Sequence, residues 1–275
     1  MTKLVGNVIH SIDGIETPLP GVDIVPYLII DEEEGPQGGL TLIDTGYLSE
    51  LPKIEKYLKN LNPTSHDLSQ IKRIILTHLH VDHVQAANEI KRRSGAKIYA
   101  HWIDARYLSN ELMYQGPLKE DIFSYMYEAL SFGTYARFKP FDREGPIKVD
   151  VTVKDGDVIG EDSGVQLEVI HAPGHTPGNI GLYSKKYRTI IGGDCLFKSI
   201  FGIQGLITPP PISSIDPLTA ALSALRISEN FDFDKLFLAH QDSPILEGAR
   251  EAVKETASKA IKFYNEIMRF LPPSA

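Results

Sequence analysis

The sequence predicts an α/β fold in which strands and helices mix along one domain, residues 1–275. Three observations support this prediction. Short apolar runs rich in β-branched residues alternate with segments whose apolar residues recur at helical spacing. Several of the apolar runs end in glycine-containing turns. No low-complexity segment or shift in composition marks a linker, so a single domain is favoured over two.

In the first hundred residues, apolar runs mark the strands and apolar residues at helical spacing mark the helices. Strands are expected at 22–30, 40–47, 71–78 and 96–101. Helices are expected at 50–61 and 84–94, and Gly95 is a suitable stop for the second. The acidic, glycine-containing stretch 31–39 separates the first two strands and is typical of a hairpin loop.

The stretch 102–146 interrupts this alternation, because it is helical in pattern and rich in Tyr and Phe. We expect a helical insertion there that caps the functional site and supplies an apolar, aromatic pocket. Strand signals then return at 150–159, 164–174, 179–184, 187–194 and 234–240. The segment 198–215, proline-rich from 209, is expected to be a loop that forms the other wall. Helices are expected at 217–228 and 247–271.

Composition and charge exclude several classes of partner. The formal net charge is −8, which disfavours nucleic acid because an acidic surface repels phosphate. The densest basic run, 91–97, is interpreted as a solvated helix end. No run is long enough to span a membrane, and the N-terminus does not resemble a signal peptide. The lone Cys195 excludes an intramolecular disulfide, so a cytoplasmic location is expected.

The segment 77–83, THLHVDH, concentrates ligand-type side chains at the end of an apolar strand. His78 and His80 are two residues apart in extended backbone, so they face the same side and can hold one ion. Asp82 and His83 follow where the chain turns into a helix, which suits a second ion nearby. A structural zinc site needs only four ligands, usually with cysteine among them, and the chain has no CxxC pair. The segment therefore indicates an open, catalytic metal site.

Three further ligand candidates follow apolar strands in the same way. His175 lies in the turn PGHTPG, Asp194 ends the segment IIGGD, and His240 ends KLFLAH. Glycines beside the first two allow the backbone to approach the site closely. His101 and His171 also lie at strand ends but are interpreted as structural, as are Cys195 and Tyr183, which we expect in the core. No role is predicted for His10 or His66.

These motifs, in this order, resemble the metallo-β-lactamase-fold hydrolases, in particular their lactonase and glyoxalase II-like branch. The resemblance covers residues 20 to 245 and includes Asp44 in the turn LIDTG. It implies a four-layer αββα sandwich with a helical insertion. It also implies two divalent ions, usually zinc although iron and manganese occur. His78, His80 and His175 would bind one ion, Asp82, His83 and His240 the other, and Asp194 would bridge them.

Two cations lower the pKa of a shared water and polarise the carbonyl or phosphoryl oxygen of the group that is cleaved. The resemblance therefore implies a hydrolase of carboxylic ester, lactone or thioester bonds that uses a bridging hydroxide. Asp82 would be the catalytic residue, orienting the hydroxide and passing a proton to the leaving group. Asp44 would hold a ligand or its loop in place. The expected partner is a small-molecule substrate, with no nucleic acid and no membrane, in a protein that is expected to be a homodimer.

Other activities of the same family stay open. The same ions would serve a phosphodiesterase or phosphotriesterase acting on small molecules, so the ligands do not separate it from an esterase. The glyoxalase II branch shares the metal motifs, but normally has a larger C-terminal helical region than the single helix expected here. A mononuclear iron persulfide dioxygenase shares the first histidine pair, but the full set of seven ligands favours two ions over one.

Overall fold

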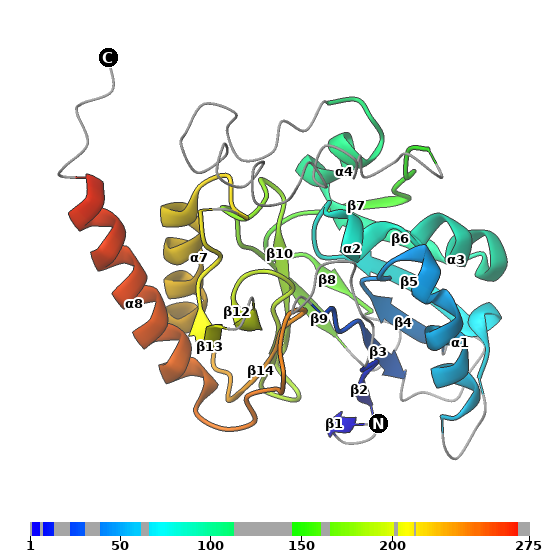
Figure 1. The fold of residues 1–275 in the computed structure, drawn as a ribbon. Coiled ribbons are helices and arrows are strands. Elements are labelled where there is room, and N and C mark those ends of the chain that lie inside the picture. The colour runs from blue at the N-terminus through cyan, green and yellow to red at the C-terminus, as the bar shows by residue number, and fades with distance from the viewer. Residues whose placement is uncertain are drawn as a thin grey trace.

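Two β-sheets lie face to face with helices on both outer sides in the computed structural model (Figure 1). The structure describes residues 2–5, 8–13, 23–30, 39–61, 66–112, 145–160, 166–200, 203–211 and 213–268. Helices α1, α3 and α4 cover one side, and α7 and α8 cover the other. This is the expected αββα arrangement.

The first sheet has seven strands that follow one another in chain order. They are β1 (Thr2–Val5), β2 (Ile9–Ser11), β3 (Tyr27–Ile30), β4 (Leu40–Ile43), β5 (Ile71–Leu76), β6 (Lys97–His101) and β7 (Val151–Val153). Neighbours from β1 to β4 are antiparallel, and those from β4 to β7 are parallel. The parallel part brings the ends of β4 and β5 to one edge of the sheet, where the ligand-bearing segment 77–83 begins.

The second sheet has five strands in the order β14-β11-β10-β9-β8. They are β8 (Val158–Ile159), β9 (Leu167–His171), β10 (Ile180–Ser184), β11 (Thr189–Ile191) and β14 (Lys235–Phe237). Strands β11 and β14 are parallel, so the residues that follow them also reach one edge. The described helical segments are η1 (Leu48–Glu50), α1 (Leu51–Lys59), η2 (Leu68–Gln70), α2 (Val81–Val84), α3 (Ala87–Ser94), α4 (Trp102–Leu108), α7 (Pro217–Asn230) and α8 (Ala249–Met268).

Alternation along the strands divides the core into three apolar layers. On β5, Ile74 packs toward the outer helices while its neighbour Ile75 packs between the sheets. On β11, Ile191 faces the space between the sheets and Ile190 faces α7 and α8. Both faces of both sheets are therefore covered, which explains why the strands appear in the sequence as continuous apolar runs.

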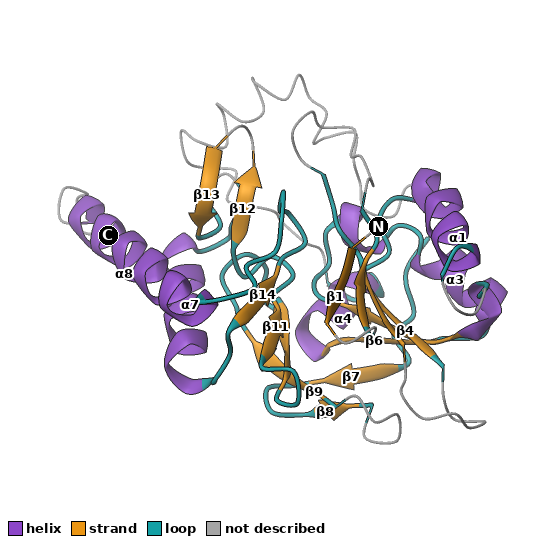
Figure 2. Ribbon diagram, turned by 90° about the horizontal axis from the view of Figure 1, so that it is seen from below, coloured by secondary structure: helices purple, strands orange, loops and turns teal. Residues whose placement is uncertain are grey.

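Two expected elements differ from the structure. The expected helix 84–94 is divided into α2 and α3, because the carbonyl of His83 accepts from Thr45 N (2.8 Å) and Oγ1 (3.0 Å), which ties it to the β4 turn. The expected loop 198–215 begins instead as a hairpin, β12 (Phe197–Ile200) and β13 (Ile203–Ile207). Figure 2 shows this hairpin on the same side of the molecule as α7 and α8.

The remaining expectations for these regions concern the basic run, the insertion and the membrane. Three of the four cations of the basic run are ion-paired at the end of α3, Lys91 with Asp150, Arg92 with Glu89 and Arg93 with Glu55, while Lys97 begins β6. Of the insertion 102–146, residues 113–144 lie outside the described residues, and with them the expected aromatic pocket.

Among the helices that the structure describes, none combines the length and apolar character needed to cross a bilayer.

Candidate metal centre

All seven predicted ligands lie together between the ends of the two sheets. Each follows a strand: the segment from His78 to His83 follows β5, His175 follows β9, Asp194 follows β11, and His240 follows β14. Five of the seven side chains are buried, and His80 and Asp82 are partly exposed. The strands fix the backbone from which these side chains extend, so the donor atoms converge with little conformational freedom. The centre opens to solvent beside the partly exposed His80 and Asp82.

Four of these residues form a first donor group: His78, His80, His175 and Asp194. The Nε2 atom of His78 lies 3.0 Å from His80 Nδ1 and 3.2 Å from His175 Nε2. The Oδ2 atom of Asp194 lies 3.1 Å from His175 Nε2 and 3.7 Å from His78 Nε2. Three ring nitrogens and a carboxylate oxygen therefore point at one position, which is the donor set that a divalent transition-metal ion takes.

A second donor group, Asp82, His83 and His240, lies beside the first. The Oδ2 atom of Asp82 is 3.4 Å from His240 Nε2 and 3.7 Å from His83 Nε2. Asp194 also reaches this group, with Oδ1 3.6 Å from His83 Nε2 and Oδ2 3.5 Å from His240 Nε2. The Asp194 carboxylate thus lies between the two groups and contacts histidines of both.

Hydrogen bonds at the far side of three imidazoles fix which nitrogen faces the centre. His83 Nδ1 lies 2.8 Å from Asp44 Oδ2, His240 Nδ1 donates to the carbonyl of Asp23 (2.8 Å), and His78 Nδ1 lies 3.1 Å from Thr77 Oγ1. Each of these bonds leaves Nε2 directed at the other donors. Carboxylate and carbonyl partners of this kind orient ligand histidines and raise their basicity.

Asp44 has the contacts that its predicted supporting role requires. Its backbone adopts φ 60°, in the left-handed region, which turns the chain sharply after β4. The carboxylate accepts from Thr77 N and Thr77 Oγ1, both at 2.8 Å, in addition to its contact with His83. Asp44 therefore connects the turn after β4 to both ends of the ligand segment.

The electrostatics of the first group favour neutral histidines. Burial and the neighbouring histidines lower the pKa of His78 well below its usual value. Burial and His175 lower the pKa of His80 to about 3. Both rings are therefore neutral at physiological pH, which is the form that binds a metal ion.

The second group holds compensating charge. Burial alone would lower the pKa of His83, but the carboxylates of Asp194, Asp44 and Asp82 raise it to about 10. Burial opposes ionisation of Asp194, yet His240, His83 and His175 lower its pKa to about 2. Buried carboxylates so close together require positive charge, which protons on His83 and His240 supply and which a divalent cation would supply more fully.

Two buried polar atoms that lack hydrogen-bond partners indicate whether a cation fits this centre. His83 Nε2 and Asp194 Oδ1 are buried and have no hydrogen-bond partner, although both point into the second group. An unsatisfied buried donor or acceptor costs about 1–3 kcal/mol, so such atoms at the centre of a site need an explanation. Coordination of a cation by these atoms provides one. The residues present therefore fit a metal centre.

Aromatic side chains surround the centre on the side of the hairpin. Phe197, at the start of β12, is 1% exposed and meets the rings of His175 (5.7 Å) and His240 (5.4 Å) edge to face. These centroid distances lie in the favourable range for aromatic pairs. Phe197 thus packs against one histidine of each donor group and, being buried, excludes water from that side of the centre.

The other singled-out residues lie outside the two groups. His101 and His171 stack on each other with centroids 4.1 Å apart. Cys195 and Tyr183 are buried in the core between the second sheet and its helices, as expected. His10 contacts Tyr57 at 3.1 Å.

Two sets of residues that support the centre were not predicted. Asp104 on α4 bonds to the turn that carries His175, and Gln241 bonds to Tyr27 beneath the turn that carries His240. Thr176 and Gly178 lie 72 and 74 residues from Asp104, and Tyr27 lies 214 residues from Gln241. No local pattern therefore marks these contacts. The one available signal was the residue type: a charged Asp in a helical segment with a high share of apolar and aromatic residues.

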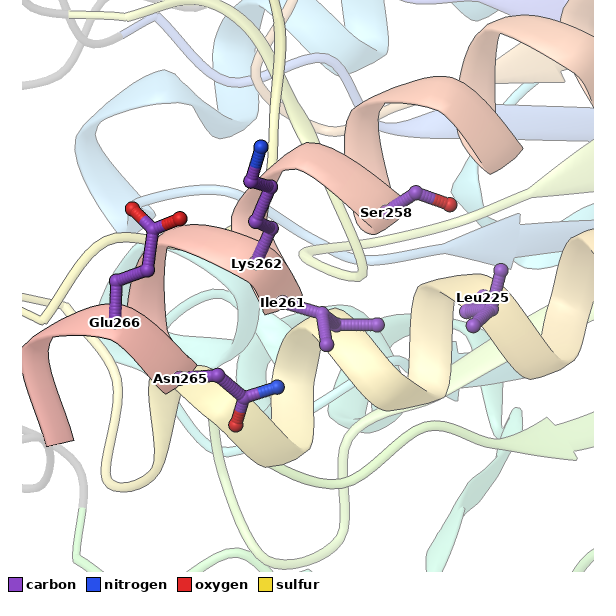
Figure 3. Close-up of a pocket in the computed structure, with 6 residues that line it drawn as sticks. All are labelled: Leu225, Ser258, Ile261, Lys262, Asn265 and Glu266. Atoms are coloured by element: carbon purple, nitrogen blue, oxygen red, sulfur yellow. The ribbon is translucent and has the colours of Figure 1, made fainter. Parts of the chain in front are cut away.

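A pocket elsewhere on the surface is separate from this chemistry. It lies between α7 and α8 (Figure 3) and is lined by Leu225, Ser258, Ile261, Lys262, Asn265 and Glu266. None of the ligand candidates contributes to it, so it has no part in the metal centre.

Comparisons with known proteins agree with this geometry. The family model of the metallo-beta-lactamase superfamily matches residues 20–240. The probable metallo-hydrolase YflN of Bacillus subtilis is 30% identical over 58% of the chain, and the hydroxyacylglutathione hydrolase GloC of Haemophilus influenzae is 29% identical over 64%. The chain spans 60% and 68% of the lengths of these relatives. A metallo-beta-lactamase family protein of Thermus thermophilus shares the fold, with TM-score 0.63 and 19% identity over 94% of this chain and 79% of that one.

Proposed function

The chain belongs to the metallo-beta-lactamase superfamily, and we propose that it is a hydrolase that uses two divalent cations to cleave carboxylic ester, lactone or thioester bonds. His78, His80 and His175 bind the first cation, Asp82, His83 and His240 the second, and Asp194 both. The position of Asp194 carries the proposal, because its carboxylate lies within 3.7 Å of histidines from both donor groups.

The donor set supports zinc, since imidazoles and carboxylates, here five and two, are ligands that zinc takes in catalytic sites. Iron and manganese remain alternatives to be separated by elemental analysis. When bound, the two cations would supply an activated water and polarise the carbonyl oxygen of the ester, lactone or thioester.

The remaining steps fall to the protein's own residues. Asp82 is partly exposed and lies at the mouth of the centre, 3.4 Å from His240. Its carboxylate orients the attacking water, accepts the water's proton as the bond to the acyl carbon forms, and returns it to the leaving alkoxide or thiolate. Asp44 holds His83 in place during this exchange. Phe197 keeps one side of the centre dry.

The substrate class rests on chemistry and on one relative. An acyl carbon next to two cations suits esters, lactones and thioesters alike. The Haemophilus influenzae relative is named for hydrolysis of hydroxyacylglutathione, which favours including a glutathione thioester among the substrates tested. We further propose that the protein is cytoplasmic, forms a homodimer and acts on a small-molecule substrate.

A hydrolysis panel on protein of measured metal content tests the proposal. We would compare kcat/KM for an acyl homoserine lactone, an aryl ester, a hydroxyacylglutathione and an aryl phosphodiester. An acyl substrate should lead, with two metal ions per chain. His240→Ala should abolish turnover, while the matched variant His10→Ala, at a buried histidine that contacts Tyr57 outside both donor groups, should not.

Two results would overturn the proposal. A leading phosphodiester would assign the chain to phosphoryl chemistry. One iron per chain together with sulfur-dependent oxygen uptake would indicate a dioxygenase.

A further inference from the structure

Asp104 is a fully buried carboxylate, 0% exposed, on the short helix α4 outside both donor groups. It accepts hydrogen bonds from Thr176 Oγ1 at 2.8 Å, from Gly178 N at 2.7 Å, and from the backbone N–H of Leu79. Burial raises its pKa to about 7, although these three bonds oppose the rise. A buried carboxylate is costly, so its place here needs a reason.

The three donors belong to the two loops that carry the first donor group. Leu79 lies between His78 and His80, and Thr176 follows His175 directly. These loops come from different sheets, one after β5 and the other after β9. Asp104 therefore joins, through a single side chain, the backbone segments that place three histidines around one position.

The fit at Gly178 shows how closely this connection is built. A Cβ at residue 178 would lie 2.5 Å from Asp104 Oδ1 and 2.7 Å from Asp104 N, closer than such atoms approach. Because one of these atoms is backbone, the neighbour cannot rotate away. Glycine at this position thus allows the amide of residue 178 to reach the carboxylate.

The carboxylate also suits this position better than an amide would. Two carboxylate oxygens offer about four lone pairs, whereas an asparagine has one acceptor oxygen and an NH₂ group that would face a donor. Three donors from two loops can be satisfied together only by the carboxylate. The residue type is explained by its partners in the ligand loops.

We propose that Asp104 is a positioning residue that holds the His78–His80 loop and the His175 turn in register, and so pre-organises the first donor group for a divalent cation. This inference rests on the proposed function, because it assigns a cation to that group. Asp104 does not touch the cation or the substrate. It acts through the backbone of Leu79 and Gly178 and the hydroxyl of Thr176.

The test compares Asp104→Asn with the wild type and with Asp150→Asn as a matched control. Asp150 also accepts a backbone N–H, from Ile98 at 2.8 Å, and pairs with Lys91, but it touches neither ligand loop. Cation affinity is measured by titrating zinc against a chromophoric chelator. Amide hydrogen exchange of Leu79 and Gly178 is measured on the metal-free protein.

Asp104→Asn should weaken binding at the first group by about 10- to 100-fold, the effect typical of losing a partner that orients ligands. It should also speed exchange of the Leu79 and Gly178 amides while exchange in the strands is unchanged. Thr176→Val, which removes only the hydroxyl donor, should give a smaller loss. Asp150→Asn should change stability but neither zinc affinity nor these two amides.

Each contrary result has a distinct meaning. If the wild type binds two zinc ions and Asp104→Asn binds them equally well, the positioning role is wrong and the proposed function stands. If Asp104→Asn weakens zinc binding no more than Asp150→Asn at equal loss of stability, the effect is only structural and the role is wrong. If the wild type binds no divalent cation, the proposed function and this inference fail together.

Discussion

The turn that carries His240 is held by a closed ring of three hydrogen bonds, which Tyr27→Phe would open. Tyr27 Oη donates to the carbonyl of Leu238 at 2.7 Å and accepts from Gln241 Nε2 at 2.7 Å. Gln241 Oε1 in turn accepts from Leu238 N at 3.1 Å. The substitution removes one oxygen and leaves the shape of the core unchanged, since the Tyr27 ring, 2% exposed, also stacks on Phe237.

The cost follows from the two groups left without a partner. An unsatisfied buried group costs about 1–3 kcal/mol. The buried Leu238 carbonyl should bear this full cost. The amide of half-buried Gln241 can regain part of its hydrogen bonding from water, so the free energy of unfolding should fall by about 2–4 kcal/mol in all. At roughly 2–4 °C per kcal/mol for a domain near this size, Tm should fall by about 5–10 °C. His240 lies two residues after Leu238, so loss of this hydrogen-bonded ring should also loosen the ligand histidine. We expect the affinity for the second cation to fall by about 10-fold.

The assays are thermal unfolding of the metal-free protein and zinc titration, with Tyr183→Phe as the matched control. Tyr183 is a core tyrosine whose hydroxyl donates only to the carbonyl of Asp232, at 2.8 Å. Its loss should cost about 0.5–1.5 kcal/mol and leave zinc binding unchanged. Equal effects of the two substitutions on Tm, or unchanged affinity for the second cation in Tyr27→Phe, would refute the reasoning.

Three further predictions follow from the centre and its supports. Asp194→Ala should lower metal content at both sites, since that carboxylate contacts histidines of each group; two tightly bound ions by elemental analysis would refute the shared role. Chelation of the bound metal should lower Tm by several degrees, because a ligand at 100 times its Kd stabilises the native state by about 2.7 kcal/mol; an unchanged Tm would show that the ions add no stability. Gly178→Ala should lose about 1–3 kcal/mol by overpacking against Asp104 in a denaturant titration. Gly181→Ala, whose Cβ would meet its nearest neighbour at 3.5 Å, is the control, and equal losses in the two variants would contradict the predicted clash.

Much of the architecture could be predicted because it is encoded locally. Short apolar runs marked the strands, and the residues that follow several of these runs were the candidate ligands. The groups that could bind metal contain all seven predicted residues, with Asp44 behind His83. This success has a physical cause: strands fix the direction of the residues that follow them, so neighbouring strand ends bring their ligands to one edge.

Local pattern failed where a distant partner decides the structure. The segment 198–215 was predicted to be a loop, yet β12 and β13 pair as a hairpin, and Lys198 N anchors it on the carbonyl of His240 at 2.8 Å. The helix expected at 84–94 is broken because the carbonyl of His83 bonds to Thr45 instead of continuing the helix. In both cases a tertiary hydrogen bond overrides the propensity of the segment.

Short segments of the chain are enough to identify the side chains that could bind metal, because residue type and position after a strand are local properties. What holds these side chains in place depends on tertiary contacts: Asp104 across two loops, and Tyr27 with Gln241 at the turn of His240. Tyr27 and Gln241 are 214 residues apart, and nothing in either neighbourhood specifies the other. A hydrogen bond between distant residues exists only once the sheets have packed, so it is a consequence of the fold and not of any local pattern.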